Sequence, residues 1–339
     1  MIDSHLTTLK LIEPFRIAHG ASAERLVLRV SGEADGIGAI GEAPFVPYYH
    51  DDPAEILRWF SAHASLDFRQ SPPVDSPRLV QLALELLRGD WMGKKNGATL
   101  GEELGEIQPS AAGSISGCRS FSIPTEMSRF EGLIKQTSEQ FKVLKLKLGS
   151  GDLAWDEQIV EVARTSAPEA VLFADVNGGW SLEQSIQMIR RLERWNLAFI
   201  EQPIHHQNGV VGWRSLRKEL GVTAMKLVAD ESSQTLEDLD GLLGLADGVN
   251  VKMLKCGGWS NAAQMMKRAK AKGFFVMLGC MIESSIGVTA AAHLAPLADW
   301  IDLDGHLYLS NDDYSGLRYG VDGELIMPDL PGIGVLRRN

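Results

Sequence analysis

The first 105 residues or so alternate short stretches of apolar and polar positions with two amphipathic stretches. Strict alternation of apolar and polar residues predicts strands with one buried face, here His5–Ile12, Arg25–Val30 and, after an Asp-Gly turn, Gly36–Ala43. The amphipathic stretches, which begin at or just after a proline, predict helices at Pro53–Ala64 and Pro77–Leu87. This part is therefore predicted to be an α+β module, and the glycine-rich stretches Lys94–Gly97 and Gly101–Gly105 suit its boundary.

From Cys118 on, the pattern changes to eight short apolar runs, most of them followed by an amphipathic stretch of helical length. The runs predict strands at Cys118–Ile123, Val143–Leu148, Val171–Asp175, Leu197–Glu201, Lys226–Asp230, Gly248–Lys252, Phe274–Leu278 and Trp300–Asp304. Helices are predicted between them, among others at Trp155–Arg164, Leu182–Arg194, Leu236–Ala246 and Asn261–Ala271. Strands that alternate with helices in this way indicate parallel βαβ units, and eight of them predict closure into a (β/α) barrel.

The length of the chain, 339 residues, accommodates a barrel and one smaller module. We therefore expect an α/β protein with an α+β domain at residues 1–105, a barrel domain at 106–310 and a turn-rich segment at 311–339. The last segment is predicted to fold back onto the first domain.

Composition narrows the class of partner. The formal net charge of −11 argues against binding to nucleic acid or to an anionic membrane, because both need basic patches. The N-terminus lacks the apolar run of a signal peptide, and no stretch approaches the roughly 18 consecutive apolar residues of a membrane span. The three cysteines have neither a C-x-x-C pair nor a disulfide-like spacing. We expect a soluble cytoplasmic protein with a small-molecule substrate, and a homo-oligomer is compatible with this.

Acidic residues end three successive predicted strands of the barrel, namely Asp175, Glu201 and Asp230. Because the carboxyl ends of the strands meet at one rim of a barrel, these carboxylates are expected to converge. Like charges so close raise one another's pKa, and a divalent cation relieves the repulsion. Ligand sets made only of oxygen atoms favour Mg²⁺, so the sequence predicts a magnesium site.

Two lysines, Lys147 and Lys252, end the second and the sixth predicted strands and therefore face each other across the barrel mouth. Such a pair could remove a proton from one face of a substrate and return it to the other. Lys145 lies on the same face of its strand as Lys147. Solvent-exposed strand ends would explain the lysines alone, but their combination with the three carboxylates favours an active site.

Five short motifs occur in this order along the barrel: K-L-K at Lys145–Lys147, D-V-N at Asp175–Asn177, E-Q-P at Glu201–Pro203, D-E-S at Asp230–Ser232 and N-V-K at Asn250–Lys252. Over essentially the whole chain, the sequence resembles the enolase superfamily, specifically its muconate-lactonising-enzyme subgroup. The resemblance implies a barrel of the modified TIM type under an N-terminal capping domain. It also implies Mg²⁺ bound by the three carboxylates, with Lys147 and Lys252 as the catalytic bases and Asn177 and Glu231 as supporting residues.

Within the subgroup, D-L-D at Asp302–Asp304 and G-C-M-I-E-S-S at Gly279–Ser285 resemble dipeptide epimerases. The resemblance implies an isomerase that moves the α-proton of the C-terminal residue of a dipeptide, with Lys147 serving the L isomer and Lys252 the D isomer. Asp302 and Asp304 would bind the α-ammonium group of the substrate. One of the two aspartates could instead cap a turn at Gly305. The predicted substrate-binding residues are Lys145, Asp302, Asp304, Glu283 and Ser120.

One departure from the family concerns the substrate side chain. Members that act on Ala-Glu carry an arginine in the loop after the first strand, and the matching position here is Ser22. A buried carboxylate without a partner is costly, so we predict that the epimerised residue is not acidic. Lys255 is predicted to lie in a loop and not to be the base, and the role of His19 in the cap loop is left open.

The same catalytic set would also serve an o-succinylbenzoate synthase, an N-acylamino acid racemase or a muconate cycloisomerase. A binding protein built on an inactive barrel is disfavoured, because every lysine and carboxylate of the set is present. Exchange of the α-hydrogen in D₂O distinguishes an enzyme from such a binding protein.

Overall fold

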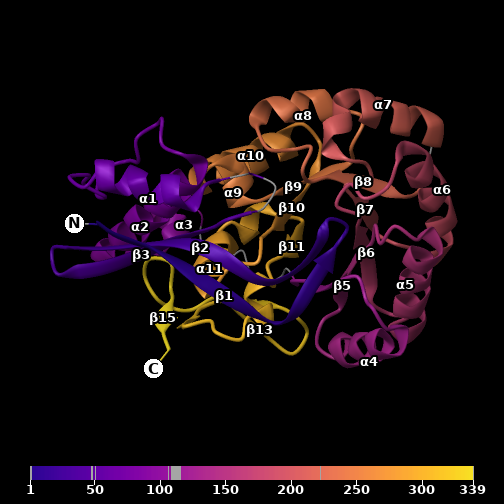
Figure 1. Ribbon diagram of the computed structural model, residues 1–339, viewed down its shortest axis with the longest axis horizontal. Helices are drawn as coiled ribbons and strands as arrows, with labels where there is room; N and C mark the ends of the chain where they lie inside the picture. Colours follow the sequence, from indigo (N-terminus) through magenta and orange to yellow (C-terminus); the bar gives the residue numbers. More distant parts are fainter. Residues whose placement is uncertain are drawn as a thin grey trace.

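The computed structural model describes residues 2–338 except 47, 48, 50, 106, 108–115 and 222. Figure 1 shows a long antiparallel sheet and three helices on one side of the molecule and a ring of strands and helices on the other. The α/β barrel with an N-terminal α+β cap, expected from the sequence, is confirmed. None of the helices in the described ranges is long and apolar enough to cross a membrane.

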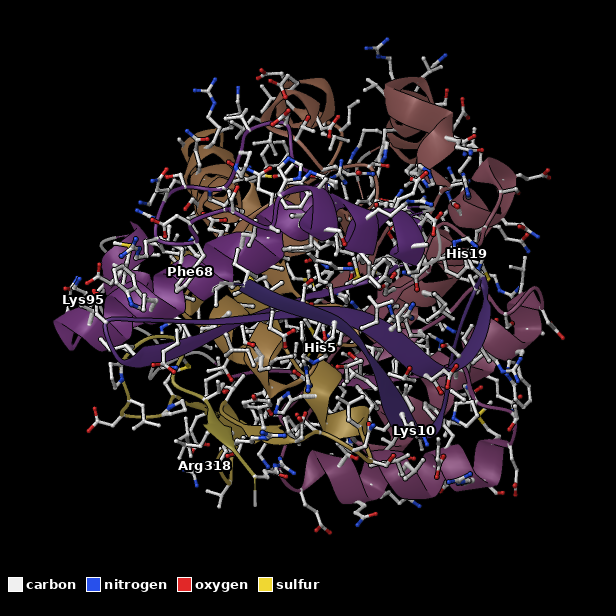
Figure 2. All side chains as sticks on the ribbon, turned by 60° about the vertical axis from the view of Figure 1, so that its left-hand side comes forward. His5, Lys10, His19, Phe68, Lys95 and Arg318 are labelled. Carbon is white, nitrogen blue, oxygen red and sulfur yellow. The ribbon has the colours of Figure 1, made fainter. Side chains whose placement is uncertain are left out.

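The cap is built on strands β1 (Ile2–Ile17), β2 (Gly20–Ala34) and β3 (Ile37–Pro44), which pair antiparallel in that order. Asp35 and Gly36 form the predicted turn between β2 and β3 with φ of 56° and 74°, a backbone conformation that favours this residue pair. All three predicted strands are confirmed, and β1 and β2 are longer than their apolar alternation. The extra length carries the tip of the β1–β2 hairpin, with His19, over the barrel (Figure 2).

Three helices complete the cap: α1 (Pro53–Ala62), α2 (Arg78–Asn96) and α3 (Leu100–Gly105). Helix α2 packs closely on β3, because Gly41 has no side chain: a Cβ there would lie 2.1 Å from the carbonyl oxygen of Ala83. The glycine-rich stretches lie largely in α2 and α3, and the boundary proposed from them stays a prediction. Gly89 contacts Leu100 and Leu104 of α3, and this packing outweighs the low helix propensity of glycine. The predicted boundary at 105/106 adjoins residues that the structure does not describe.

In the described part of the barrel, eight parallel strands follow one another in sequence order. They are β4 (Arg119–Phe121), β5 (Val143–Lys147), β6 (Val171–Asp175), β7 (Phe199–Glu201), β8 (Lys226–Ala229), β9 (Gly248–Val251), β10 (Phe275–Gly279) and β11 (Trp300–Asp302). A single bridge between Gly117 and Ile301 brings the first strand next to the last. Stacked Phe173 and Phe199, with Trp300 against both, fill the amino-terminal end of the barrel interior. The polar site is therefore confined to the opposite rim.

The helices around the barrel are α4 (Met127–Ser138), α5 (Leu153–Ser166), α6 (Leu182–Leu192), α7 (Gly209–Leu220), α8 (Leu236–Leu242), α9 (Met253–Cys256), α10 (Trp259–Ala271) and α11 (Ser285–Ala292). Short 3₁₀ helices lie at η3 (Glu193–Trp195), η4 (His206–Asn208), η5 (Ala295–Leu297) and η6 (Gly305–Tyr308). The named helix predictions hold in position, although α8 ends four residues earlier than the stretch Leu236–Ala246.

The C-terminal segment forms two small hairpins, β12 (Tyr314–Ser315) with β15 (Leu336–Arg337) and β13 (Arg318–Tyr319) with β14 (Leu325–Ile326). It contacts the cap: the amide of Leu100 donates to the carbonyl oxygen of Gly332 over 2.7 Å, and the amide of Ile333 donates to Asp90 Oδ1 over 2.9 Å. Both chain ends lie on the cap side in Figure 1. The division of the chain at residues 105 and 310 stays a prediction.

Candidate active site

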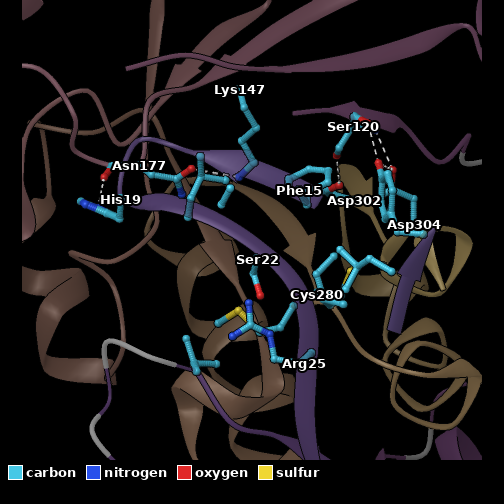
Figure 3. Close-up of a pocket in the computed structure, with 18 of the residues that line it drawn as sticks. Phe15, His19, Ser22, Arg25, Ser120, Lys147, Asn177, Cys280, Asp302 and Asp304 are labelled. Carbon is cyan, nitrogen blue, oxygen red and sulfur yellow. Dashed lines mark hydrogen bonds between the residues drawn. The ribbon is translucent and has the colours of Figure 1, made fainter. Parts of the chain in front are cut away.

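A cavity of about 410 Å³ lies between the cap and the carboxyl ends of the barrel strands. The cap contributes a mainly apolar wall, which includes Leu11, Phe15, Ile17 and Val46. The barrel contributes charged and polar groups, among them Ser120, Lys147, Lys252, Asp302 and Asp304 (Figure 3). A ligand bound in this cavity can therefore contact both an apolar wall and several charged groups.

The hairpin tip of the cap rests on the barrel loops and covers this cavity. His19 Nε2 lies 2.7 Å from the carbonyl oxygen of Asn177, and the contact is drawn in Figure 3. Gly149 and Gly179 leave room for the tip, because a Cβ at Gly179 would lie 2.7 Å from Ala18 Cβ. His19, whose role the sequence left open, thus connects the cap to the barrel.

The three predicted metal ligands come together at the barrel rim. Asp175 ends β6, Glu201 ends β7, and Asp230 follows β8 directly. Each offers a carboxylate oxygen within 4.8 Å of the other two, and among the described residues this is the one cluster of its kind. All three side chains are fully buried.

The three carboxyl groups of the cluster differ in the direction in which their pKa is shifted. Burial, and then repulsion by Asp175, raises the pKa of Glu201 to about 8. Burial opposes ionisation of Asp175 as well, but the ammonium groups of Lys145 and Lys147 outweigh it and hold the pKa of Asp175 below its ordinary value. Lys252 and Lys255 lower the pKa of Asp230 against burial in the same way. Three full negative charges therefore do not coexist here at neutral pH without a further cation.

Three polar residues form hydrogen bonds to these carboxylates or to the backbone beside them. Gln202, with φ of 39°, accepts a hydrogen bond from the amide of Asp230 over 3.0 Å, and Asn250 Nδ2 donates to Glu201 Oε1 over 2.6 Å. Asn177, with φ of 47°, donates its amide to Asp175 Oδ1 over 2.9 Å and its side chain to Glu231. Positive φ in residues other than glycine is costly and concentrates at functional sites. Gln202 and Asn250 stand within the E-Q-P and N-V-K motifs, but the sequence alone assigned them no role.

The three lysines surround the carboxylate cluster. Lys145 is 1% exposed, and its ammonium nitrogen lies 2.6 Å from Asp302, 2.8 Å from Glu201 and 3.0 Å from Asp175. Burial disfavours the charge of Lys145, but these carboxylates raise the pKa of Lys145 well above its ordinary value. It is therefore a fixed cation.

Lys147 and Lys252 lie on two sides of the cluster. Lys147 Nζ contacts Asp175 Oδ2 at 2.6 Å and Asn177 Oδ1 at 3.1 Å, whereas Lys252 Nζ contacts Asp230 Oδ2 at 2.7 Å. Their strands, β5 and β9, are four positions apart in the barrel, and both side chains line the cavity. Gly279 on β10 leaves room for Lys252, because a Cβ there would lie 3.0 Å from Lys252 Cε.

Lys255 lies in helix α9 and not in a loop, so this part of the prediction is wrong. One turn of helix sends its side chain back under the site, where the ammonium group contacts Asp230 Oδ1 and donates to the carbonyl oxygens of Asp230 and Asn250 over 2.6 and 2.7 Å. The side chain is 1% exposed. It neutralises Asp230 from behind and does not line the cavity.

Asp302 and Asp304 lie on either side of Ser120 (Figure 3). Ser120 Oγ donates to Asp302 Oδ1 over 2.9 Å, and the amide of Ser120 donates to Asp304 Oδ2 over 2.6 Å. The side chain of Asp304 makes no capping hydrogen bond at Gly305, so the turn-capping alternative is not observed. Burial and then Asp302 raise the pKa of Asp304, and a positive ligand would relieve both effects.

Glu283, a predicted substrate-binding residue, lies outside the cavity lining, whereas Arg25, which has no predicted role, belongs to it. Glu283 is buried with Oε1 accepting from the amide of Met281 over 2.8 Å, and it does not line the cavity; burial raises the pKa of Glu283 to about 7. Its contact with substrate stays a prediction. Arg25, on β2, lines the cavity together with Ser22, although the sequence did not single it out. Its spacing is the signal in the sequence, since Arg25 stands three residues beyond Ser22.

Comparisons with known proteins agree with this architecture. Residues 130–337 match the family model described as enolase C-terminal domain-like. An L-Ala-D/L-Glu epimerase from Bacteroides thetaiotaomicron is 30% identical over 97% of this chain and 86% of that protein. A hydrophobic dipeptide epimerase from a Flavobacteria bacterium is 31% identical over 97% of this chain and 96% of that protein.

A solved structure extends the comparison to three dimensions. The dipeptide epimerase from Methylococcus capsulatus, complexed with Mg and the dipeptide L-Arg-D-Lys, has a TM-score of 0.87 and 25% identity, and 99% of each chain is covered. Cap, barrel and C-terminal segment are thus arranged as in that enzyme. The family match and the near full-length relatives show that the chain belongs to the enolase superfamily and is an isomerase of the epimerase kind.

Proposed function

We propose that the protein is a Mg²⁺-dependent dipeptide epimerase that transfers the α-proton of the C-terminal residue. The observation that carries this proposal is the approach of Lys147 and Lys252 to the carboxylate cluster from two sides, in a cavity that also contains Asp302 and Asp304. The relatives named as epimerases of dipeptides support the same substrate class. A library of L,L-dipeptides incubated in D₂O and followed by mass spectrometry tests it, because the proposal requires deuterium at one α-carbon.

The residues present fit a magnesium ion. Asp175, Glu201 and Asp230 would hold it, since they offer only oxygen ligands and carry a charge conflict that a divalent cation removes. Glu201 Oε2, which faces Lys145 Nζ at 2.8 Å, has no hydrogen bond of good geometry within the described residues. When bound, such an ion stabilises negative charge on the carboxylate of the substrate.

The lysines supply the proton transfer in this proposal. Lys147, as the neutral amine, removes the α-proton from an L-configured residue, and Lys252, as the ammonium, delivers its proton to the opposite face; the two protonation states and roles reverse for the D isomer. Lys145 stays charged and stabilises the negative charge that develops beside the α-carbon. Elimination or cycloisomerisation on the same set remains the alternative reaction.

Asp304→Asn is expected to raise KM for L-Ala-L-Leu about 10- to 100-fold, because a charge-assisted hydrogen bond to the substrate ammonium is lost. The matched probe is N-propionyl-L-Leu, which has the same shape without the ammonium group, and its affinity should change little. Steady-state kinetics and competitive inhibition measure the two values. An equal loss for both compounds would remove Asp304 from the ammonium site.

For the side chain of the epimerised residue we propose an apolar or neutral group. Ser22 stands at the position of the family's arginine, and the cap wall of the cavity is mainly apolar. A second candidate, an acidic side chain, is favoured by Arg25, which lines the same cavity and donates to the carbonyl oxygen of Phe45 over 3.3 Å.

One experiment separates the two specificities. We expect kcat/KM for L-Ala-L-Leu to exceed that for L-Ala-L-Glu by about 100-fold, the cost of burying a carboxylate without a dedicated partner. Arg25→Gln should leave the value for L-Ala-L-Leu within about threefold. If L-Ala-L-Glu is instead the better substrate and Arg25→Gln abolishes its advantage, Arg25 determines an acidic specificity. The cytoplasmic location and a homo-oligomeric state remain predictions.

A further inference from the structure

Tyr308, at the end of η6, has a buried hydroxyl group in contact with the proposed ammonium site. The hydroxyl donates to Asp304 Oδ2 over 2.6 Å, and the same oxygen contacts the carbonyl oxygen of Ser120. Neither the family resemblance nor the comparisons give this tyrosine a role. It lines the cavity, so it lies within reach of a substrate as well as of Asp304.

Among the described residues, the hydrogen bonds to the Asp304 side chain all reach the same carboxylate oxygen. The amide of Ser120 at 2.6 Å, the hydroxyl of Tyr308 at 2.6 Å and Arg119 Nη1 at 3.5 Å all meet Oδ2. Within the described ranges no hydrogen bond reaches Oδ1. A carboxylate with one oxygen anchored in this way has a fixed orientation, and its second oxygen is left for a ligand in the cavity.

Tyr308 is itself held by two further side chains. The guanidinium carbon of Arg119 lies 4.0 Å from the ring centroid, a cation–π distance, and the ring of Phe15 meets it edge-on with centroids 4.9 Å apart. Phe15 belongs to the cap hairpin, whereas Arg119 belongs to β4. Tyr308 therefore joins the cap and the barrel at the point where Asp304 faces the cavity.

We propose that Tyr308 is the positioning residue that selects substrates with a free α-ammonium group, because it anchors Asp304 through Oδ2 and leaves Oδ1 to that group. This inference rests on the proposed function and adds a residue to it. Loss of the phenol hydroxyl removes one of the three contacts that fix Oδ2 and loosens the carboxylate, which weakens the ammonium contact without changing the carboxylate cluster or the two lysines.

Tyr308→Phe tests the inference, since it removes one oxygen atom and keeps the ring contacts with Phe15 and Arg119. The matched control is Tyr319→Phe, a half-buried tyrosine whose buried hydroxyl oxygen has no hydrogen-bond partner in the described part of the chain. The probes are L-Ala-L-Leu and N-propionyl-L-Leu, the latter as a substrate or a competitive inhibitor. Circular dichroism and thermal melting verify that both variants fold.

We expect Tyr308→Phe to raise KM for L-Ala-L-Leu about 10-fold, with kcat within about threefold and the affinity for N-propionyl-L-Leu unchanged. Tyr319→Phe should change neither value. An equal loss for both probes, or no loss, overturns the inference while leaving the proposed function intact. If the unaltered enzyme turns over no dipeptide at all, the proposed function fails first and this inference fails with it.

Discussion

Asp230→Asn is expected to lower turnover by about 10³-fold or more and to weaken binding of Mg²⁺, because a divalent ion contributes several kcal/mol to stabilising the charge that develops in the reaction. Asp230 sits between Lys252 and Lys255, so its loss also leaves two buried ammonium groups without their carboxylate. Isothermal titration with Mg²⁺, steady-state kinetics and thermal melting measure the three effects separately.

Glu201→Gln provides a second variant for the same prediction. With a pKa of about 8, Glu201 is mostly neutral at pH 7 in the metal-free chain, so the amide closely replaces the native group and the fold should survive. Metal affinity and turnover should still fall. Asp240→Asn on the surface of α8 is the matched control and should behave as the unaltered enzyme. Full activity in an excess of chelator would contradict metal dependence altogether.

Lys252→Ala is expected to lower epimerisation by about 10²–10⁴-fold, the usual contribution of general acid–base catalysis, while Lys147 still exchanges the α-hydrogen of the L-configured substrate in D₂O. Lys147→Ala should show the opposite preference and exchange only the D-configured residue. The reason is geometric: Lys147 Nζ contacts Asp175 and Lys252 Nζ contacts Asp230, so the two lysines lie on two sides of the carboxylate cluster. Mass spectrometry measures exchange, and chiral chromatography measures epimerisation.

The matched control is Lys226→Ala, which removes an exposed lysine at the amino end of β8, away from the site. It should retain the rates of the unaltered enzyme in both assays. If a variant at Lys147 or Lys252 epimerises near the rate of the unaltered enzyme, that lysine is not a base. Loss of exchange with both isomers in either single variant would instead indicate that the two lysines act as one unit.

The sequence by itself determined the barrel and the composition of its rim. Apolar runs alternate with amphipathic helices at the length of one βα unit, and parallel strands must then bring their carboxyl ends to one face. For that reason Asp175, Glu201 and Asp230 were predictable as a cluster, as was the placement of Lys147 and Lys252 on two sides of it. Local periodicity and strand order suffice for these positions, because each residue is located by its own strand.

Only the tertiary structure decided contacts between residues that no local pattern connects. Lys255 folds back to Asp230 because a single helical turn follows β9, and Arg25 lines the cavity because the cap sheet lies over the rim of the barrel. Tyr308 meets Phe15 only because the cap closes on the barrel. Gly97 ends α2 in the left-handed conformation, and Leu100–Gly105 then forms helix α3, which packs on α2. In each case the deciding free energy comes from burial and packing between distant segments, which propensity and spacing along the chain do not express.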